Sequence, residues 1–333
     1  MILVTGGTGH LGNVLVRELE GAGNSVRVLV LPGEDTAALE GTRVEVVYGN
    51  ILDPSTLDQA MHGVKTVFHL AALVSIEPGR EDLLYKVNVE GTKNVLASSM
   101  ANGVKKFIYT SSIHALARPP LGVQIDETQP FDTDNEAGPY DRTKALASME
   151  VLQANHNGLD SVILCPTGVI GPFDYRRSEM GEQIIEWMTK KVSFLVKGMF
   201  DWVDVRDVAR AQILASLKGK PGQTYIIGGH QVSIKGIRST VAKLVNNRSL
   251  AITIPLPVAL WATYLTDIYY KVYRKRPRFT RYSLETVNSN SQISSKRAEK
   301  ELGYQPRPFA NTLQDTVAWW LANQKRVSAG LRV

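Results

Sequence analysis

Residues 1–12 read MILVTGGTGHLG, an apolar strand that runs directly into glycines at positions 6, 9 and 12. Gly6 allows a sharp turn at the end of the strand, and Gly9 allows the backbone to approach a pyrophosphate with no Cβ between them. Gly12 allows the next helix to lie close to the sheet, so that the N–H groups of its first turn point at the phosphates. The stretch therefore predicts a dinucleotide-binding strand, loop and helix.

The spacing of these glycines is Gly-x-x-Gly-x-x-Gly, which differs from the better known Gly-x-Gly-x-x-Gly fingerprint. Turns collect glycine for structural reasons as well, so a string of glycines is weak evidence alone. Its position at a strand-to-helix junction is what favours nucleotide binding. The helix is supported by apolar residues at positions 11, 14, 15 and 19.

Strands and helices alternate through the first half of the chain. Apolar, β-branched runs predict strands at 26–31, 44–48, 66–70, 106–110 and 162–164, and helices are expected at 11–21, 55–62, 82–102 and 138–155. This alternation predicts an α/β fold, a Rossmann-type doubly wound parallel sheet whose carboxyl edge holds the ligand.

The rhythm changes after Pro166, where we expect a smaller, mostly helical C-terminal substrate lobe. Residues 171–200 are expected to be loop-like around a helix at 180–191, and a helix at 310–324 closes the chain. A strand at 224–227 is expected to rejoin the sheet. We therefore place the NAD(P)-binding domain at 1–170, with returning segments near 200–228, and the substrate lobe mainly at 171–333.

The composition is that of an ordinary globular protein, with 44% hydrophobic and 21% charged residues among 333. The single cysteine, Cys165, excludes an internal disulfide and suits a reducing compartment. The first strand begins at residue 2 without a basic leader, so we expect no signal peptide and a cytoplasmic location. Six scattered histidines lack metal-ligand spacing, and we expect no metal.

The net charge of +6 raises the question of a nucleic-acid partner. The dense basic run is at 271–278 and no nucleic-acid-binding module accompanies it, so we expect a solvated patch and no nucleic acid. The preceding residues, 250–270, are apolar but interrupted by Pro255, Pro257 and Asp267, which disfavours a membrane span. Segment 250–281 fits a peripheral contact with an anionic membrane surface, or a helix that walls an apolar substrate pocket.

Tyr140 and Lys144 are spaced to share one face of a helix. A free phenol has a pKa of about 10, and a nearby ammonium together with a positively charged nicotinamide would favour the phenolate and bring that pKa toward neutrality. Ser111 and Ser112 follow the strand at 106–110, where a hydroxyl can hold a substrate oxygen; we choose Ser112. The ordinary alternatives are a surface Tyr–Lys pair and a serine that caps a turn.

Several motifs occur together in one order along nearly the whole chain. They are TGGTGHLG at 5–12, HLAA at 69–72, VNVEGT at 87–92, YTSS at 109–112, the Tyr140–Lys144 pair, PTGVIGP at 166–172, WVDVRDV at 202–208 and ELGYQP at 301–306. Together they resemble the extended short-chain dehydrogenase/reductases, and within them the dihydroflavonol reductase and 3β-hydroxysteroid dehydrogenase branch.

The resemblance implies that Ser112, Tyr140 and Lys144 form a catalytic triad. It also implies cofactor contacts at Gly6, Thr8, Gly9, His10, Leu11, Gly12, Leu31, Asn50, Ile51, Leu70, Ala71, Ala72, Asn88, Thr110, Tyr140, Lys144, Pro166, Thr167, Gly168 and Val169. Helices 82–102 and 138–155 pair with their copies in this family, which predicts a homodimer. The apolar positions Leu84, Val87, Val95, Met100, Leu146 and Val151 fit that interface or burial against the sheet.

Two positions depart from the family pattern. Asn50 replaces an aspartate that contacts the adenine, and Leu31 is neither the acid expected for NAD nor the arginine expected for NADP. Glu34 and Asp35 follow closely and would repel a 2′-phosphate, and no Lys or Arg lies near them in sequence. The sequence therefore favours NAD over NADP, although helix capping explains the two acids equally well.

The first functional hypothesis is an oxidoreductase that transfers hydride between a nicotinamide and a largely apolar alcohol or carbonyl substrate. Sugar-nucleotide epimerases and dehydratases are the alternative, but their usual arginine is replaced by Phe200 and their Arg-x-x-Asn by residues 164–167. A non-catalytic NAD(P) sensor commonly loses the tyrosine or lysine that this chain retains. The pocket walls are expected among His114, Phe173, Tyr175, Met180, Trp187 and Phe200, each of which fits core packing as well. The substrate stays open.

Overall fold

The computed structural model describes residues 1–75, 79–263 and 281–323. Of the apolar and basic segment at 250–281, residues 264–280 therefore lie outside the described residues, and so does the basic run at 271–278. None of the helices in the described part of the chain is long and apolar enough to cross a bilayer.

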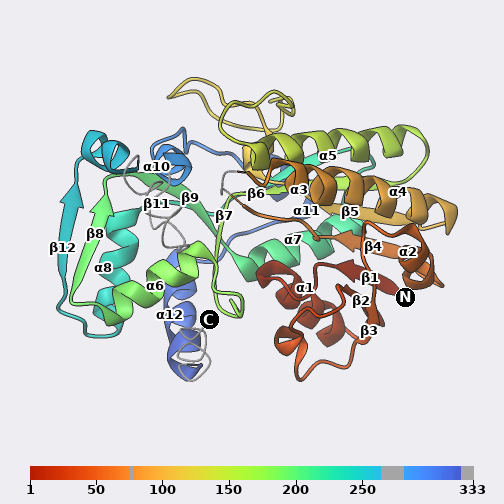
Figure 1. Ribbon diagram of the computed structural model, residues 1–333, viewed down its shortest axis with the longest axis horizontal. Coiled ribbons are helices and arrows are strands. Elements are labelled where there is room, and N and C mark those ends of the chain that lie inside the picture. The colour runs from red at the N-terminus through yellow and green to blue at the C-terminus, as the bar shows by residue number, and fades with distance from the viewer. Residues whose placement is uncertain (76–78, 264–280, 324–333) are drawn as a thin grey trace.

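A seven-stranded parallel sheet occupies the N-terminal half of the molecule (Figure 1). Its strands are β1 (Ile2–Thr5), β2 (Val26–Val30), β3 (Glu45–Tyr48), β4 (Thr66–His69), β5 (Lys106–Thr110), β6 (Ser161–Pro166) and β10 (Thr224–Ile227). The order β10-β6-β5-β4-β1-β2-β3 reverses direction between β1 and β4. A doubly wound sheet binds ligands at the carboxyl edge beside such a reversal, so the predicted fold is confirmed.

Helices cover both faces of this sheet (Figure 1). One face carries α1 (His10–Gly21), α7 (Val205–Lys218) and α11 (Lys296–Leu302) over a core that includes Leu15, Val28 and Val208. The other carries α2 (Pro54–Met61), α4 (Gly91–Ala101) and α5 (Pro139–His156) over Leu57, Val95 and Val151. The helix expected at 82–102 is divided, because α3 (Glu81–Tyr85) passes through a wider π-helical turn at Lys86–Glu90 before α4.

The C-terminal part contains more strand than the sequence predicts. β7 (Gly168–Ile170), β9 (Met199–Asp204) and β11 (His230–Ser233) form a three-stranded sheet, and β8 (Val192–Val196) pairs in parallel with β12 (Leu250–Ile254). The loop expected at 171–200 is therefore wrong in part. β7, β8, β11 and β12 are short and partly exposed, and β9, although buried, is interrupted by Asp201 and Asp204, so none has the continuous apolar run that marks the buried parallel strands.

The remaining helices pack around these small sheets. They are α6 (Glu179–Thr189), α8 (Ile234–Leu244), α10 (Arg281–Val287) and α12 (Phe309–Ala322), with short 3₁₀ turns at Ala37–Leu39 and Ile113–Ala115. Residues 256–263 are also helical. In Figure 1 this lobe lies to the left of the seven-stranded sheet, with β8 and β12 at its outer end.

Candidate active site

The residues predicted to contact a cofactor follow the carboxyl ends of six adjacent strands. In spatial order these ends carry Asn50 and Ile51 after β3, Leu31 after β2, Gly6–Gly12 after β1, Leu70–Ala72 after β4, Thr110 and Ser112 at β5, and Pro166–Val169 at β6. One edge of the sheet therefore collects segments that are up to 160 residues apart in sequence.

The glycine loop is packed so tightly that side chains are excluded. Gly6 has a φ of +71°, and a Cβ there would lie 2.7 Å from the amide nitrogen of Ala71. A Cβ on Gly12 would collide with the carbonyl oxygen of Gly6. Gly9 is the N-cap of α1 and has no side chain that could accept from the first N–H groups. These N–H groups are left to a ligand such as a pyrophosphate.

Ser112 and Tyr140 meet at the carboxyl end of β5. Ser112 is buried and Tyr140 is half-buried on the first turn of α5, and the Ser112 hydroxyl is near enough to lower the pKa of the Tyr140 phenol. Ser112 also accepts from the N–H of His114 at 3.2 Å, so it caps a turn as well. Ser111 instead bonds Ser148 at 2.7 Å. The pair presents two hydroxyls that one substrate oxygen can reach.

The protein's own groups around Tyr140 raise the pKa of its phenol. Burial raises this pKa, and the charge of Asp141 raises it further, while the neighbouring Ser112 hydroxyl lowers it. The side chain of Lys144 is buried, yet its Nζ donates to the Tyr109 hydroxyl at 2.9 Å and to the Thr110 carbonyl at 2.5 Å. A buried amine must find acceptors, and these two lie closest at the end of β5. Burial lowers the pKa of Lys144 to about 7.

A buried polar chain that the sequence reasoning missed lies behind Lys144. Tyr109, which accepts from Lys144, stacks on the ring of His69 with centroids 5.7 Å apart. Nε2 of His69 contacts the Thr92 hydroxyl at 2.9 Å, and Nδ1 contacts the Thr5 hydroxyl at 2.7 Å. Burial lowers the pKa of His69 to about 3, so the ring is neutral. The chain joins the ends of β1, β4 and β5. A histidine within an otherwise apolar strand was the available signal.

Asn88 fixes the segment that follows β4. Its amide donates to the Leu73 carbonyl at 3.0 Å and to the Thr143 hydroxyl at 3.1 Å, and it accepts from the Leu73 N–H at 2.7 Å. The side chain thus holds residues 70–73 against α5, which differs from the direct cofactor contact expected. Asn50 likewise uses its side-chain carbonyl within the chain, accepting from Leu52 at 2.9 Å.

An arginine from the lobe overturns the expectation that no cation lies near Glu34. Glu34 bends back to accept from the Leu31 N–H at 3.1 Å and the Thr8 hydroxyl at 2.8 Å. Arg176 forms an ion pair with Glu34 and donates to the Thr8 hydroxyl at 2.7 Å. The same loop contacts α1, where His10 bonds the Pro172 carbonyl at 3.0 Å. Exposed Leu31 contributes only its backbone here.

The six residues expected to wall the pocket lie in three different places. His114 stacks on Phe200 with ring centroids 5.7 Å apart and also faces Tyr282 of α10. Trp187 and Met180 belong to the lobe's core, while Phe173 and Tyr175 pack against Trp319. Only His114 and Phe200, among the six named from the sequence, are thus tied to the Ser112 turn.

Asp141 links that region to the lobe. It is fully buried and accepts from Arg118 and from the Tyr282 hydroxyl, both at 2.7 Å. Burial raises the pKa of Asp141 to about 6, although both partners lower it. The residue beside Tyr140 is therefore fixed from both parts of the molecule.

Pro166–Val169 pass beside the Ser112 turn, because the Ser111 N–H donates to the carbonyl of Leu164 in β6 at 2.7 Å. Thr167 donates to Asp201 of β9 at 2.7 Å, and Gly168 lies against Trp202. Within the described residues, no group of three or more His, Cys, Asp or Glu is arranged to hold a metal.

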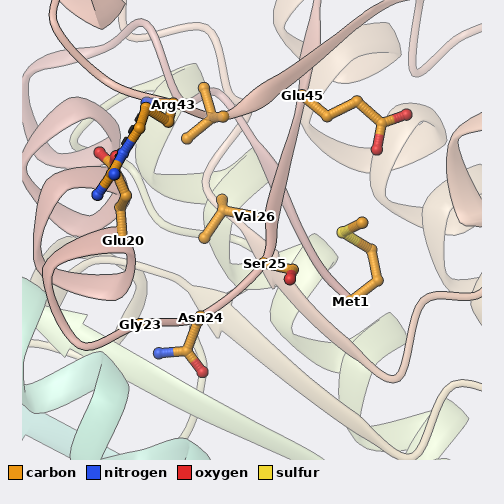
Figure 2. Close-up of a pocket in the computed structure, with 9 residues that line it drawn as sticks. Met1, Glu20, Gly23, Asn24, Ser25, Val26, Arg43 and Glu45 are labelled. Carbon is orange, nitrogen blue, oxygen red and sulfur yellow. Dashed lines mark hydrogen bonds and ion pairs between the residues drawn. The ribbon is translucent and has the colours of Figure 1, made fainter.

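Two cavities in the described part of the molecule lie away from these residues. One, of about 310 Å³, is at the amino ends of β1–β3, where Arg43 pairs with Glu20 beside Met1 and Val26 (Figure 2). The other, of about 500 Å³, lies along α1 beside Phe173 and Arg206. Neither is lined by Ser112, Tyr140 or Lys144.

The chain matches, over residues 3–231, the family described as 3-beta hydroxysteroid dehydrogenase/isomerase. It is 34% identical to "Sterol demethylase protein B" of Methylococcus capsulatus, covering 96% of this chain and 97% of that one. It is 31% identical to the "Putative dihydroflavonol 4-reductase" of Synechocystis, covering 95% and 93%. The crystal structure of gox2253 has a TM-score of 0.84 at 32% identity, covering 97% of this chain and 98% of its own.

Proposed function

Because the chain belongs to the 3-beta hydroxysteroid dehydrogenase/isomerase family of extended short-chain dehydrogenase/reductases, we propose that it is an NAD-dependent oxidoreductase acting on an apolar ketone or secondary alcohol. The observation that carries this proposal is that Ser112 and Tyr140 come together at the carboxyl end of β5, near the reversal of the sheet. Enzymes of this family use a nicotinamide cofactor, and the residues at that edge fit one.

The fit rests on two features of the edge. The glycine loop leaves the first N–H groups of α1 without a side-chain acceptor, and close packing forbids a Cβ on Gly6 or Gly12. Among the described residues, the buried hydroxyl of Thr110, the last residue of β5, has no protein partner, and the carbonyl of the same residue accepts from Lys144. A buried hydroxyl without a partner is costly, and a ligand hydroxyl would satisfy it. When bound, a nicotinamide supplies the hydride donor or acceptor.

The chain's own residues then handle the proton. Tyr140 donates to or accepts from the substrate oxygen, and Ser112 hydrogen-bonds the same oxygen as its charge develops. Since burial and Asp141 raise the pKa of Tyr140, the phenol is protonated at neutral pH. A protonated phenol suits the donor in carbonyl reduction. Lys144 lies one helical turn away, where it can bond a ribose hydroxyl of the cofactor.

The substrate is proposed to be apolar because of the residues beyond Ser112. Phe200 is buried and stacked on His114, at the position where sugar-nucleotide epimerases usually carry an arginine for the diphosphate. Burial lowers the pKa of His114 to about 3, so this ring carries no charge at neutral pH. An anionic diphosphate would find neutral rings there, beside an arginine, Arg118, whose charge is already paired with Asp141, and this disfavours the epimerase and dehydratase alternative.

Substitution of Tyr140 by phenylalanine tests the chemistry. The Tyr140→Phe variant should lose about 10²–10⁴-fold in kcat, since the proton donor is removed, whereas its affinity for NADH should stay unchanged. A panel of ketones and alcohols read by NADH absorbance measures the first, and a fluorescence titration measures the second. Tyr48→Phe, at an exposed tyrosine of β3, is the matched control. Full turnover by Tyr140→Phe would refute the mechanism.

Glu34 and Arg176 are proposed to set the choice of cofactor. A carboxylate held at the end of β2 can accept from the 2′-hydroxyl of NAD and repels the 2′-phosphate of NADP. Glu34→Gln removes that charge and releases Arg176, so the affinity for NADPH should rise about tenfold relative to NADH, equivalent to ~1.4 kcal/mol.

Titration of both reduced cofactors by fluorescence measures the ratio without any substrate. Adding Arg176→Ala to Glu34→Gln should remove the gain, because the released guanidinium is then absent. Glu299→Gln, at an exposed carboxylate of α11, is the control and should leave the ratio unchanged. A wild-type protein that prefers NADPH would refute the assignment of Glu34.

A further inference from the structure

The outer end of the lobe carries an exposed apolar face. β8 and β12 pair in parallel with Leu250 opposite Val192 and Ile252 opposite Phe194, which places these four side chains on one side of the two-stranded sheet. All four are exposed, Phe194 by 48% and Leu250 by 61%. The intervening Ser193 and Leu195 are buried on the opposite side, which faces α8. In Figure 1 the pair lies at the far left of the molecule.

The helical residues 256–263 cover only part of this face. At the carboxyl end of the strands, Val196 is buried with Ala259 and Leu284, and Leu256 and Leu260 pack beside them. The same helix turns Val258 and Trp261 outward, 53% and 64% exposed. We call Val192, Phe194, Leu250, Ile252, Val258 and Trp261 the lobe-end face. Exposed apolar groups gathered in this way mark an interaction site.

The two segments that build the lobe-end face carry positive charge only, while α6 and α10 beside them contribute Glu186, paired with Lys190, and Glu285, paired with Arg281. The two segments that build this end, residues 190–200 and 233–263, contain seven lysines and arginines and no aspartate or glutamate. Lys191 and Arg248 are exposed at the starts of β8 and β12, where the Leu250 N–H bonds the Lys191 carbonyl at 2.9 Å. Lys197 is exposed directly after β8. Anionic surfaces therefore complement this end of the molecule.

We propose that the lobe-end face docks the protein on the surface of an anionic lipid bilayer. The apolar side chains enter the boundary between headgroups and acyl chains, an exposed tryptophan sits at headgroup depth, and the flanking cations contact anionic lipids. Because apolar burial and charge act together, binding requires both the lobe-end face and the flanking cations Lys191, Lys197 and Arg248. This proposal is independent of the chemistry assigned to Tyr140.

Vesicle flotation tests the proposal on the full chain. The protein should float with vesicles of phosphatidylcholine and phosphatidylglycerol in equal parts at 50 mM salt, and at least tenfold less with phosphatidylcholine alone or at 500 mM salt. Phe194→Ser with Trp261→Ser should reduce binding at least tenfold, and Lys191→Gln with Arg248→Gln severalfold. Leu217→Ser, at a 75% exposed leucine of α7, is the matched control and should bind like the wild type.

Thermal melting checks that each variant is folded. If the double variant unfolds, quenching by brominated lipid replaces it, because wild-type tryptophan fluorescence should fall on anionic vesicles and that of Trp261→Phe should not. Failure of the wild type to bind anionic vesicles would overturn the proposal, as would undiminished binding by the apolar double variant. A third result would also overturn the proposal. Light scattering would show that the wild type is a dimer which Phe194→Ser converts to a monomer, and neither the dimer nor the monomer would bind vesicles.

Discussion

Lys144 is a buried amine held by two acceptors. Its Nζ donates to the Tyr109 hydroxyl and to the Thr110 carbonyl, and it lies 4.4 Å from the centre of the Tyr109 ring. Removal from water disfavours the ammonium more than these partners favour it, so the pKa falls from 10.5 to about 7. The native protein therefore binds this proton less tightly than the unfolded chain does.

This difference predicts a pH-dependent stability. Between pH 7 and 10.5 the unfolded chain holds the proton and the native state does not, so the group's contribution to the free energy of unfolding rises with pH. Below pH 7 the native state carries the full cost. Lys144→Met should therefore stabilise the cofactor-free protein, relative to wild type, by roughly 4 kcal/mol more at pH 6.5 than at pH 10. Urea unfolding at both pH values measures this.

The control for this experiment is Lys93→Met, at an exposed lysine of α4, which should change little at either pH. Lost hydrogen bonds to Tyr109 and Thr110 lower the stability of Lys144→Met equally at both pH values, so they leave the comparison intact. If Lys144→Met and wild type differ in their free energy of unfolding by the same amount at pH 6.5 and pH 10, the lowered pKa of Lys144 is contradicted.

At the scale of residues, local spacing predicted which side chains share a helix face but not what they touch. The interval between Tyr140 and Lys144 placed both on α5, and Ser112 reached Tyr140 because β5 ends beside that helix. The acceptors of Lys144 could not be predicted, since they depend on how far the amine is buried. Arg176 could not be predicted either, because the loop that brings it to Glu34 is 142 residues away.

At the scale of elements, the start of α1 depends on close packing against the loop before it. Gly12→Ala would place a methyl group against the Gly6 carbonyl, so the helix must shift and the phosphate-facing N–H groups with it. Gly21, the last residue of the same helix, has no heavy atom near its potential Cβ within 4 Å. The two positions therefore form a matched pair.

We expect Gly12→Ala to abolish measurable NADH binding and to lower the melting temperature. Gly21→Ala should bind NADH normally and gain up to about 1 kcal/mol, because alanine favours the helix over glycine. Calorimetric titration and thermal melting measure both effects. Tight NADH binding by Gly12→Ala would show that the close approach is not needed.

The same distinction between buried and half-exposed elements decides what could be predicted. The central strands were predicted within a residue or two, because continuous β-branched runs allow few other structures. β8 and β12 were missed, since each buries one side only and their pairing joins residues about 58 apart. The π-helical turn at Lys86–Glu90 leaves no mark in the spacing, because the apolar residues around it continue a helical pattern.

At the scale of the whole molecule, most candidate dimer positions are occupied within the chain. Leu84, Val95 and Val151 are buried, so they support the alternative of packing against the sheet, whereas Met100 stays exposed by 41%. The homodimer stays a prediction. One link between the two parts of the chain is a set of ion pairs between α7 and the region of α12.

Arg206 is the centre of that set. Its guanidinium donates to the buried carboxylate of Asp204 at 2.8 Å and 3.0 Å, and forms an ion pair with Asp315 of α12 at 2.7 Å. Arg307, just before α12, bonds Asp207 of α7 at 2.8 Å. Burial would raise the pKa of Asp204, but its hydrogen bonds to Arg206 and the arginine charges outweigh burial and hold it below its usual value.

Arg206→Met should therefore lower the free energy of unfolding by about 3 kcal/mol at pH 7. The buried carboxylate of Asp204 would keep only its longer ion pair with Arg307, at 3.6 Å. Asp315→Asn removes a half-exposed partner of the same arginine and should cost less than about 1 kcal/mol. A depressed carboxylate pKa stabilises above its unfolded value near 3.8 and loses that effect as the pH falls below it. The difference in the free energy of unfolding between Arg206→Met and wild type should accordingly be smaller at pH 3 than at pH 7, as measured by urea unfolding. Equal losses in the two variants at pH 7 would mean that the exposed contact with α12, and not the buried carboxylate, holds the two parts together.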